Sequence, residues 1–376
     1  AYQGADPTGT ENQAVSTHNT SPDAHTSLFA AKQNKLTGAQ GQVVGFDSQG
    51  NAQAQDPPGG GSGKRVCRFV VGTSTAGWTA DDCDYLCDGT ADDVEINAAI
   101  QALPSTGGEV VILDGTYNIT ATIAMNKNYV TLSGNGAATV LKRMWNGSSM
   151  GVVTVTADYC TVKNLQIDGN KSSYPSGNGI YLSRSSNNIV IGNTCNNSVN
   201  GISLNFSDNN TITSNICIAN TNGIYLSGVS SQYNAIAGNA CNDNSNCGIS
   251  LSNSYSNAIT GNTCNGNNVG IYFSNVCSDN TIIGNVCSGN ANGIFSQSGS
   301  IENKNITITG NTCNNNSISG ISLKSLTNGT VTSNTCIRGD GTPSDYTNLQ
   351  YTIRMQTNTQ DNIITGNNIM GKNYVD

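Results

Sequence analysis

The sequence is poor in charged residues and has no long apolar run. Charged residues make up 11% of the 376 residues, and the formal net charge is -8. Lysine and arginine form no cluster beyond pairs such as Lys64–Arg65 and Lys142–Arg143, which argues against a nucleic-acid groove. No apolar stretch is long enough to span a bilayer. We therefore expect neither a nucleic-acid partner nor membrane insertion.

Histidine is almost absent. The two histidines, His18 and His25, both lie near the start of the chain, so the rest of the chain has no imidazole base. In a trimeric stalk, three copies of one histidine could meet on the axis and hold a metal. Plain polar linker residues are the alternative, and we expect no metal site and no cofactor.

Cysteine marks an internal repeat. Seven of the 13 cysteines are spaced 22, 24, 23, 23, 26 and 23 residues apart: Cys195, Cys217, Cys241, Cys264, Cys287, Cys313 and Cys336. A repeat this short cannot bury an apolar face alone, so its copies must stack into a solenoid. We expect these side chains to form a buried stack of mostly free thiols, which favours assembly in a reducing compartment.

Three further cysteines lie outside this stack. The spacing Cys83-X3-Cys87 could serve a metal, with Cys67 as a third ligand. No histidine lies nearby, and a packing role is the favoured interpretation.

Each repeat reads Asn-Gly-Ile-X-Leu, a polar bend, then Asn-X-Ile-X-Gly-Asn-X-Cys. Alternation along a strand sends Ile180 and Leu182 inward and Tyr181 outward. A second inward column should comprise Ile167, Val190, Ile212, Ile236, Ile259, Ile282, Ile308, Val331 and Ile364. Two or three short strands per repeat, with no helix between them, predict an all-β fold, a single right-handed parallel β-helix of ~23-residue coils.

Asparagine forms further columns, such as Asn193, Asn215, Asn239, Asn262, Asn285, Asn311 and Asn334. Asparagine tolerates left-handed backbone at bends and can bond to its copy one turn away, so we assign these columns to fold stability as an asparagine ladder.

The chain divides into four segments by composition. Residues 1–56 are polar and read as an N-terminal attachment and oligomerisation segment, and 57–64 as a Pro/Gly-rich linker. Residues 65–115 should form a cap region with a short capping helix at about 91–103, started by Asp92 or Asp93 and stopped by Pro104. Residues 116–376 should form the β-helix, with its period broken at 338–361.

The segment Asp88-Gly89-Thr90-Ala91-Asp92-Asp93, continued by Gly107-Gly108-Glu109-Val110 to Tyr117, resembles the helical cap and first coil of pectate-lyase-like β-helices in phage and prophage tail spikes. The Asn-Gly-Ile and Gly-Asn-X-Cys coils resemble the repeats of the same superfamily, and 17–25 and 35–52 resemble linking segments of tail fibres. The resemblance implies a tail fibre or spike, but no particular reaction, because this fold hosts lyases, hydrolases, epimerases and inert binders.

Candidate catalytic residues gather on the early coils. Most of the solenoid's charge lies in the set Lys142, Arg143, Asp158, Lys163, Asp168, Lys171, Tyr174, Tyr181 and Arg184. In one hypothesis, Asp168 with Lys171 or Tyr181 acts on an acidic glycan while Arg184 binds its carboxylate. A solvated charged face near the cap is the alternative.

A binding role has a firmer geometric basis. The outward position after Asn-Gly-Ile is occupied in turn by Tyr181, Ser203, Tyr225, Ser250, Tyr272, Phe295 and Ser322. Through Tyr272, an aromatic residue occurs at every second turn, a spacing of roughly 10 Å that is comparable to a disaccharide in an extended chain. We therefore predict glycan binding by Tyr181, Tyr225, Tyr272 and Phe295. Alternatively, these rings favour strands or bury a subunit interface.

The sequence thus predicts a phage- or prophage-type tail fibre or spike that recognises a bacterial surface polysaccharide. We expect a homotrimer held by the N-terminal segment, on a virion tail or other extracellular particle and assembled in the bacterial cytoplasm. The alternatives are a polysaccharide lyase or glycoside hydrolase on the same β-helix, and a structural filament or surface protein, which would expose uncapped coils at both ends.

Overall fold

The computed structural model describes residues 67–147, 150–228, 231–297, 303–338 and 351–370, and the backbone of 43–46, 52–55 and 374–375. The chain forms two units, Ala1–Arg65 and Val66–Asp376. In the first unit, β1 (Val43–Phe46) pairs antiparallel with β2 (Ala52–Gln55). The linker predicted at 57–64, both histidines and most of the predicted attachment segment lie outside the described residues.

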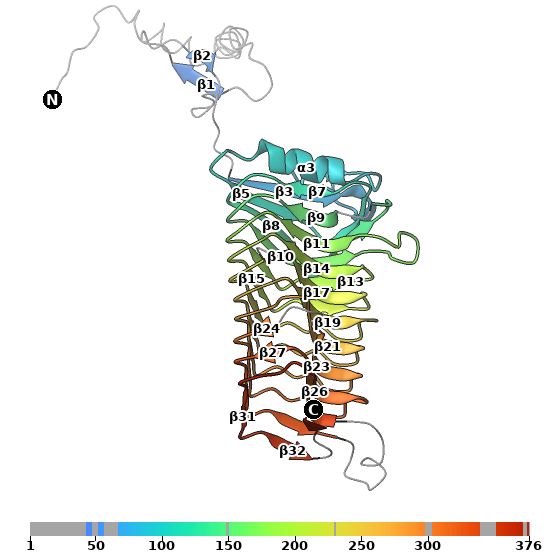
Figure 1. Cartoon of the computed structure of the whole chain (residues 1–376). Coiled ribbons are helices and arrows are strands. Elements are labelled where there is room, and N and C mark those ends of the chain that lie inside the picture. Colours follow the sequence, from blue (N-terminus) through green and yellow to red (C-terminus); the bar gives the residue numbers. More distant parts are fainter. Residues whose placement is uncertain are drawn as a thin grey trace, which may run out of the picture. The chain divides into compact units, whose positions relative to one another are not determined.

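The second unit is a stack of coils whose strands form long parallel sheets (Figure 1). One sheet has 11 strands. In chain order they are β7 (Ile123–Met125), β9 (Gly151–Val155), β11 (Asn178–Ser183), β14 (Asn200–Asn205), β17 (Asn222–Ser227), β19 (Cys247–Ser252), β21 (Val269–Ser274), β23 (Asn292–Gln297), β26 (Ser319–Leu323), β30 (Tyr351–Met355) and β33 (Tyr374–Val375).

A second sheet has 16 strands. They are β3 (Arg68–Thr73), β4 (Tyr85–Cys87), β5 (Gly108–Ile112), β6 (Gly115–Ile119), β8 (Val130–Arg143), β10 (Thr161–Asp168), β12 (Ile189–Ile191), β13 (Thr194–Asn196), β15 (Thr211–Thr213), β16 (Ile216–Ile218), β18 (Ala235–Ala237), β20 (Ala258–Thr260), β22 (Thr281–Ile283), β25 (Thr307–Thr309), β28 (Thr330–Thr332) and β31 (Ile363–Thr365).

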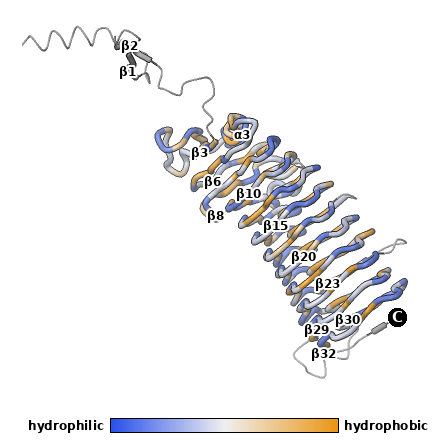
Figure 2. Tube along the Cα trace, turned by 90° about the vertical axis from the view of Figure 1, so that its left-hand side faces the viewer, coloured by the Kyte–Doolittle hydropathy of each residue, from blue (hydrophilic) through white to orange (hydrophobic). Residues whose placement is uncertain are grey.

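Two short parallel pairs complete the coils, β24 (Asn303–Lys304) with β27 (Leu326–Thr327), and β29 (Thr335–Ile337) with β32 (Asn368–Met370). A 3-10 turn, η1 (Ser74–Ala76), follows β3. Apolar and polar segments recur from coil to coil (Figure 2). The predicted all-β parallel β-helix is confirmed.

The helix α3 (Asp93–Ala102) lies over the N-terminal end of the coils (Figure 1). Ile96, Ile100 and Leu103 bury its inner face, as the helical spacing predicted, whereas Val94 is exposed. The carboxylates do not cap the helix, which corrects that expectation. Asp92 accepts hydrogen bonds from the N–H groups of Gly89 and Asn118, and Asp93 from that of Thr120. These bonds connect the helix to the first coil. The two carboxylates point toward that coil because they accept hydrogen bonds there from N–H groups that would otherwise lack partners.

The interior is made of stacked side-chain columns. The seven repeat cysteines are buried and, like the other described cysteines, are free thiols. The register corrects one assignment: Val162 pairs with Val190, whereas Ile167 pairs with Cys195 and so lies in the cysteine column. The reason is that β10 is one continuous strand across the position at which later coils bend at Gly-Asn. It therefore supplies both inward residues of its coil, Val162 and Ile167.

Glycine is required where a coil packs against the cysteine column. A Cβ atom at Gly223 would lie 2.5 Å from the carbonyl oxygen of Gly248 and 2.9 Å from the Cβ of Cys241. The backbone at Gly223 therefore lies too close to the next coil and to the cysteine column to carry a side chain.

Buried asparagines join successive coils. The Oδ1 atom of Asn262 accepts bonds from the backbone N–H and the Nδ2 atom of Asn239, both at 2.9 Å. Its own Nδ2 donates to the carbonyl of Ile236 and to Oδ1 of Asn285. The same pattern repeats from Asn193 to Asn367, so the bends have hydrogen-bond partners despite their burial.

We predict that Asn262→Ala lowers the free energy of unfolding by about 2 to 3 kcal/mol, because it leaves buried donors on Asn239 and a buried acceptor on Ile236 without partners. The exposed Asn268 is the matched control, and Asn268→Ala should change stability by less than about 0.5 kcal/mol. Urea midpoints followed by circular dichroism measure both. Equal losses in the two variants would contradict a structural role for the buried column.

Candidate functional site

The outward positions of the 11-stranded sheet form one continuous column. Its register runs through Tyr181, Ser203, Tyr225, Ser250, Tyr272, Phe295 and Ser322, which we call the outer column. The strands that carry it lie one below another along one side of the coils, from β11 to β26 (Figure 1). Strand alternation buries Ile180 and Leu182 completely and leaves Tyr181 partly exposed.

The upper part of the outer column lines a shallow hollow, the tyrosine groove, with a volume of about 480 Å³. Tyr181 and Tyr225 are separated by one coil, and Ser203 lies between them. Ser203 is 4% exposed, so the rings and the flanking side chains form the accessible surface. The full lining is Ser176, Gly177, Asn178, Tyr181, Val199, Asn200, Ser203, Asn205, Tyr225 and Ser227. It contains no Asp, Glu, Lys, Arg or His.

Amide and hydroxyl groups border this groove on both sides. On one side, Nδ2 of Asn200 donates to Oδ1 of Asn178 at 2.8 Å, and Asn222 donates to Asn200 at 2.9 Å. On the other side, Nδ2 of Asn205 donates to Oγ of Ser227 at 3.1 Å. These bonds hold the polar groups in fixed positions, and each amide keeps further donor and acceptor capacity.

The lower aromatic residues are arranged differently. Tyr272 and Phe295 occupy adjacent coils, and their rings stack with centroids 5.8 Å apart and planes at 13°. The hydroxyl of Tyr272 lies 3.3 Å from Oε1 of Gln297, and burial raises the pKa of Tyr272. Near-parallel planes at this centroid distance are an offset stack, in which each ring covers part of the other.

Asp168, Lys171 and Arg184 do not line the tyrosine groove, whereas Tyr181, which the catalytic hypothesis also names, does. Asp168 ends β10 in the other sheet, where its carboxylate accepts bonds from the N–H of Asn170 and Nδ2 of Asn197. Arg184 lies over the ring of Phe206, 5.8 Å from its centroid. The backbone N–H of Lys171 donates to the carbonyl of Asn197. The hydrogen bonds of Asp168 thus give it a structural role. A catalytic role for Asp168, Lys171 and Arg184 stays a prediction.

Two other charges of the early coils have structural partners. Arg143 is 1% exposed, lies 3.9 Å from the ring centroid of Trp145, and donates from Nη2 to the carbonyl of Gly147. Lys163 pairs with Glu109 at 3.1 Å, and Arg68 lies 3.6 Å from the same carboxylate. These contacts indicate that part of the charged set serves packing.

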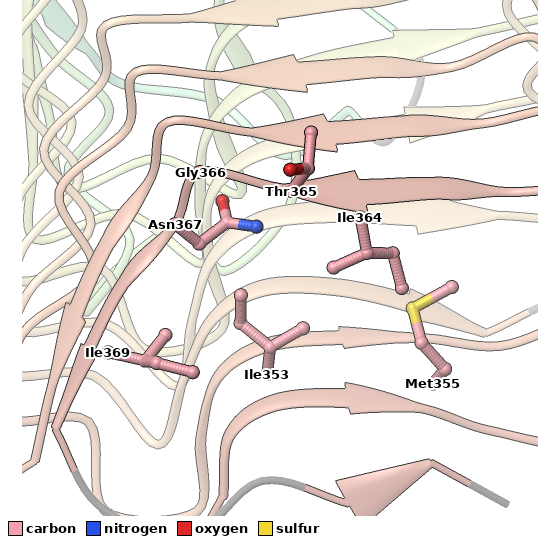
Figure 3. Close-up of a pocket in the computed structure, with 7 residues that line it drawn as sticks. All are labelled: Ile353, Met355, Ile364, Thr365, Gly366, Asn367 and Ile369. Atoms are coloured by element: carbon pink, nitrogen blue, oxygen red, sulfur yellow. The ribbon is translucent and has the colours of Figure 1, made fainter.

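The C-terminal end of the coils opens into an apolar hollow of about 420 Å³ (Figure 3). Ile353, Met355, Ile364 and Ile369 point into it (Figure 3). Ile364 continues an inward column but is 41% exposed, because no described strand pairs with β31 on its far side. The hollow therefore exposes part of the core at this end of the described coils.

Sequence reasoning missed Arg354, which continues the outer column beyond Ser322. Residues 339–350 interrupt the repeat just before β30 and lie outside the described residues. The signal was nevertheless present, because Tyr351-Thr-Ile-Arg-Met matches the pattern of Asn-Gly-Ile-X-Leu at its isoleucine and at the outward position.

Comparison with known proteins identifies the family. Residues 106–303 match the family described as periplasmic copper-binding protein (NosD). The chain belongs to the NosD family. Comparison with curated protein sequences finds no match.

The NosD-family chain also shares its fold with solved structures. The Dettilon tailspike protein (gp208) matches with a TM-score of 0.65 and 17% identity, over 76% of this chain and 60% of the tailspike. ORF18 of Geobacillus virus E2 matches with a TM-score of 0.61 and 15% identity, over 89% of this chain and 67% of ORF18. The A-module of the Azotobacter vinelandii mannuronan C-5 epimerase AlgE4 gives 0.54 and 17%, over 81% and 99%. These identities establish a common fold.

The described residues of this NosD-family chain do not fit a copper site. Copper favours imidazole and soft sulfur ligands, and the described residues contain no histidine. Bonds to neighbouring thiols, together with burial, raise the pKa of Cys195, Cys241, Cys264 and Cys313, so these ligands stay protonated.

One cluster of possible ligands remains among the described residues, formed by Cys87, Asp92 and Glu95 within 4.8 Å of one another. It offers two hard carboxylates, and both oxygens of Asp92 already accept backbone N–H groups. Burial raises the pKa of the Cys87 thiol.

Among the described residues, no helix is long and apolar enough to cross a membrane.

We predict that iodoacetamide modifies Cys67 rapidly in the folded protein, because that side chain is exposed, and leaves Cys264 and the other six repeat cysteines intact. Burial keeps the reagent from all seven thiols, and a raised pKa further suppresses the thiolate of Cys264. All 13 cysteines should react after unfolding in guanidinium. Peptide mass spectrometry measures both states, and comparable labelling of Cys67 and Cys264 before unfolding would contradict the buried column.

Proposed function

We propose that this protein is a phage- or prophage-type tail fibre or spike that recognises a bacterial surface glycan along its outer column. The observation that carries the proposal is the tyrosine groove, where two partly exposed tyrosines two coils apart border a neutral hollow. Tyr181, Tyr225, Tyr272 and Phe295 are the proposed contact residues.

The chemistry of the face suits a sugar chain. Tyrosine offers a large apolar surface with few rotatable bonds, and a sugar ring presents C–H groups that can stack on it. Asn178, Asn200 and Ser227 supply neutral donors and acceptors in fixed positions for hydroxyl groups. Because successive strands lie about 4.8 Å apart, the outer column offers contacts at regular intervals to a linear glycan that lies along it.

The shared fold supports the biological setting. Two of the similar structures are a tailspike protein and a product of a bacterial virus, and others act on sugars, such as DFA-IIIase from Arthrobacter chlorophenolicus A6. We infer a location on the virion tail or another extracellular particle, after assembly in the bacterial cytoplasm. Residues 1–56 would join three copies into a homotrimer.

A polysaccharide depolymerase is the second candidate, favoured by the likeness to sugar-acting enzymes. Asp168, Lys171 and Arg184 are its candidate residues. Hydrolysis of a glycosidic bond typically uses two carboxylates facing the scissile bond. The tyrosine groove has none in its lining, which favours binding without cleavage at that place.

A structural filament is the third candidate. A filament that grows by stacking coils needs an open edge at each end. The helix α3 covers the N-terminal end with Ile96, Ile100 and Leu103, and this counts against end-to-end growth.

We predict that Tyr181→Ala and Tyr225→Ala each weaken glycan binding about 10-fold, or ~1.4 kcal/mol, by removing a stacking surface. Binding to an array of bacterial surface polysaccharides measures the effect. Tyr233→Ala is the matched control, because Tyr233 is 62% exposed and lies outside the outer column.

The same array separates the candidates. Unchanged binding by the double variant Tyr181→Ala/Tyr225→Ala would overturn the groove. Release of oligosaccharides by the wild type, lost in Asp168→Asn, would establish the depolymerase instead.

The trimer is testable independently of any ligand. We predict that light scattering of the full chain gives a molar mass three times the 39.0 kDa of one chain. A monomer would contradict the proposed role of residues 1–56.

A further inference from the structure

The outer column continues past the tyrosine groove into a second hollow near the C-terminal end of the same sheet. This hollow, the Arg354 hollow, has a volume of about 260 Å³ and lies across β23, β26 and β30. In the column, Phe295 is followed by Ser322 and then by Arg354. Both hollows therefore share one face and one line of side chains.

The side chains of the Arg354 hollow are held in place. The guanidinium carbon of Arg354 lies 4.8 Å from the ring centroid of Tyr351, which is 9% exposed and thus fixed by its packing. Nε2 of Gln356 donates to Oγ of Ser322 at 2.6 Å. Arg354 and Gln356 are two residues apart, so alternation places both on the outer side. A stacked guanidinium loses less rotamer freedom when it binds an anion, because its plane is already set.

Arg354 is unusual in its surroundings. The 11 strands of this sheet contain one charged residue, and it is Arg354. The tyrosine groove at the other end offers rings, amides and hydroxyls alone. A cation at the one charged position of these strands, in a chain of net charge -8, discriminates between ligands that differ by one negative group.

The chemistry of arginine points to the kind of group. Its planar fork of N–H donors matches the two oxygens of a carboxylate. Phe295 beside it can stack on the ring that carries this carboxylate, and Gln356 and Ser322 can bond to neighbouring hydroxyls.

The two hollows can be reached by one ligand. Tyr225 on β17 and Arg354 on β30 are separated by five strand-to-strand steps. At ~4.8 Å per step, this is about 24 Å along the sheet, a distance that an extended oligosaccharide can span.

We propose that the Arg354 hollow is a subsite for a carboxylate-bearing sugar, so that the recognised polysaccharide is acidic and binds with a uronic-acid-type unit at Arg354 and further units in the tyrosine groove. This inference rests on the proposed glycan-binding function.

The test uses an array of paired linear oligosaccharides of six to eight units, each present in a neutral form and in a form with hexose C6 oxidised to the carboxylate. Wild type should bind at least one carboxylated member 10-fold or more tightly than its neutral partner, and 0.5 M NaCl should reduce this preference. Arg354→Gln should abolish the preference and leave binding of the neutral partner unchanged, whereas Arg354→Lys should keep part of it.

The matched control is Arg68→Gln, which removes one exposed positive charge from the other sheet and should keep the full preference. Melting temperatures of all variants verify the fold. Equal binding of the paired members by wild type, or an unchanged preference in folded Arg354→Gln, would overturn the acidic subsite and leave the glycan function standing. Absence of binding to every member would overturn both.

Discussion

The structure depends on one constraint: each coil must repeat the path of the preceding coil closely enough for buried groups to find partners in it. The buried asparagines show the constraint most directly, because Asn262 satisfies donors on one neighbouring coil and uses an acceptor on the other. A bend of different shape would leave several buried polar groups without partners, each costing about 1 to 3 kcal/mol. Because the bends must be regular, successive coils follow the same path, and like residues lie above one another in columns throughout the interior.

The same regularity organises the outer face. Inward positions carry the stability, so outward positions of the 11-stranded sheet can vary without loss of the core. Tyr181, Ser203 and Tyr225 follow one another at the spacing of the coils, which turns a sequence period into a linear surface. Substitutions along such a surface alter which ligand binds more readily than they alter the fold. The contrast between the neutral tyrosine groove and Arg354 is an example of this freedom.

The family and the fold neighbours carry different information. The chain belongs to a family described as copper-binding, yet its described residues lack histidine, and its seven repeat cysteines are buried in the core. Structures of similar fold include a tailspike protein and a mannuronan C-5 epimerase. A coil that supplies its own hydrogen bonds leaves the exterior free for unrelated functions, so function has to be argued from surface residues.

The repeat in the sequence was sufficient to predict the parallel coils, the buried cysteines and the alignment of the outer tyrosines, because a period of constant length leaves one way to stack. Only the tertiary structure showed that Ile167 lies in the cysteine column, that Asp92 and Asp93 bond to the first coil, and that Arg354 joins the outer column. These features arise where the period is broken, at the cap, at β10 and before β30. There, neighbours in space are set by packing between distant segments, and local spacing no longer carries the register.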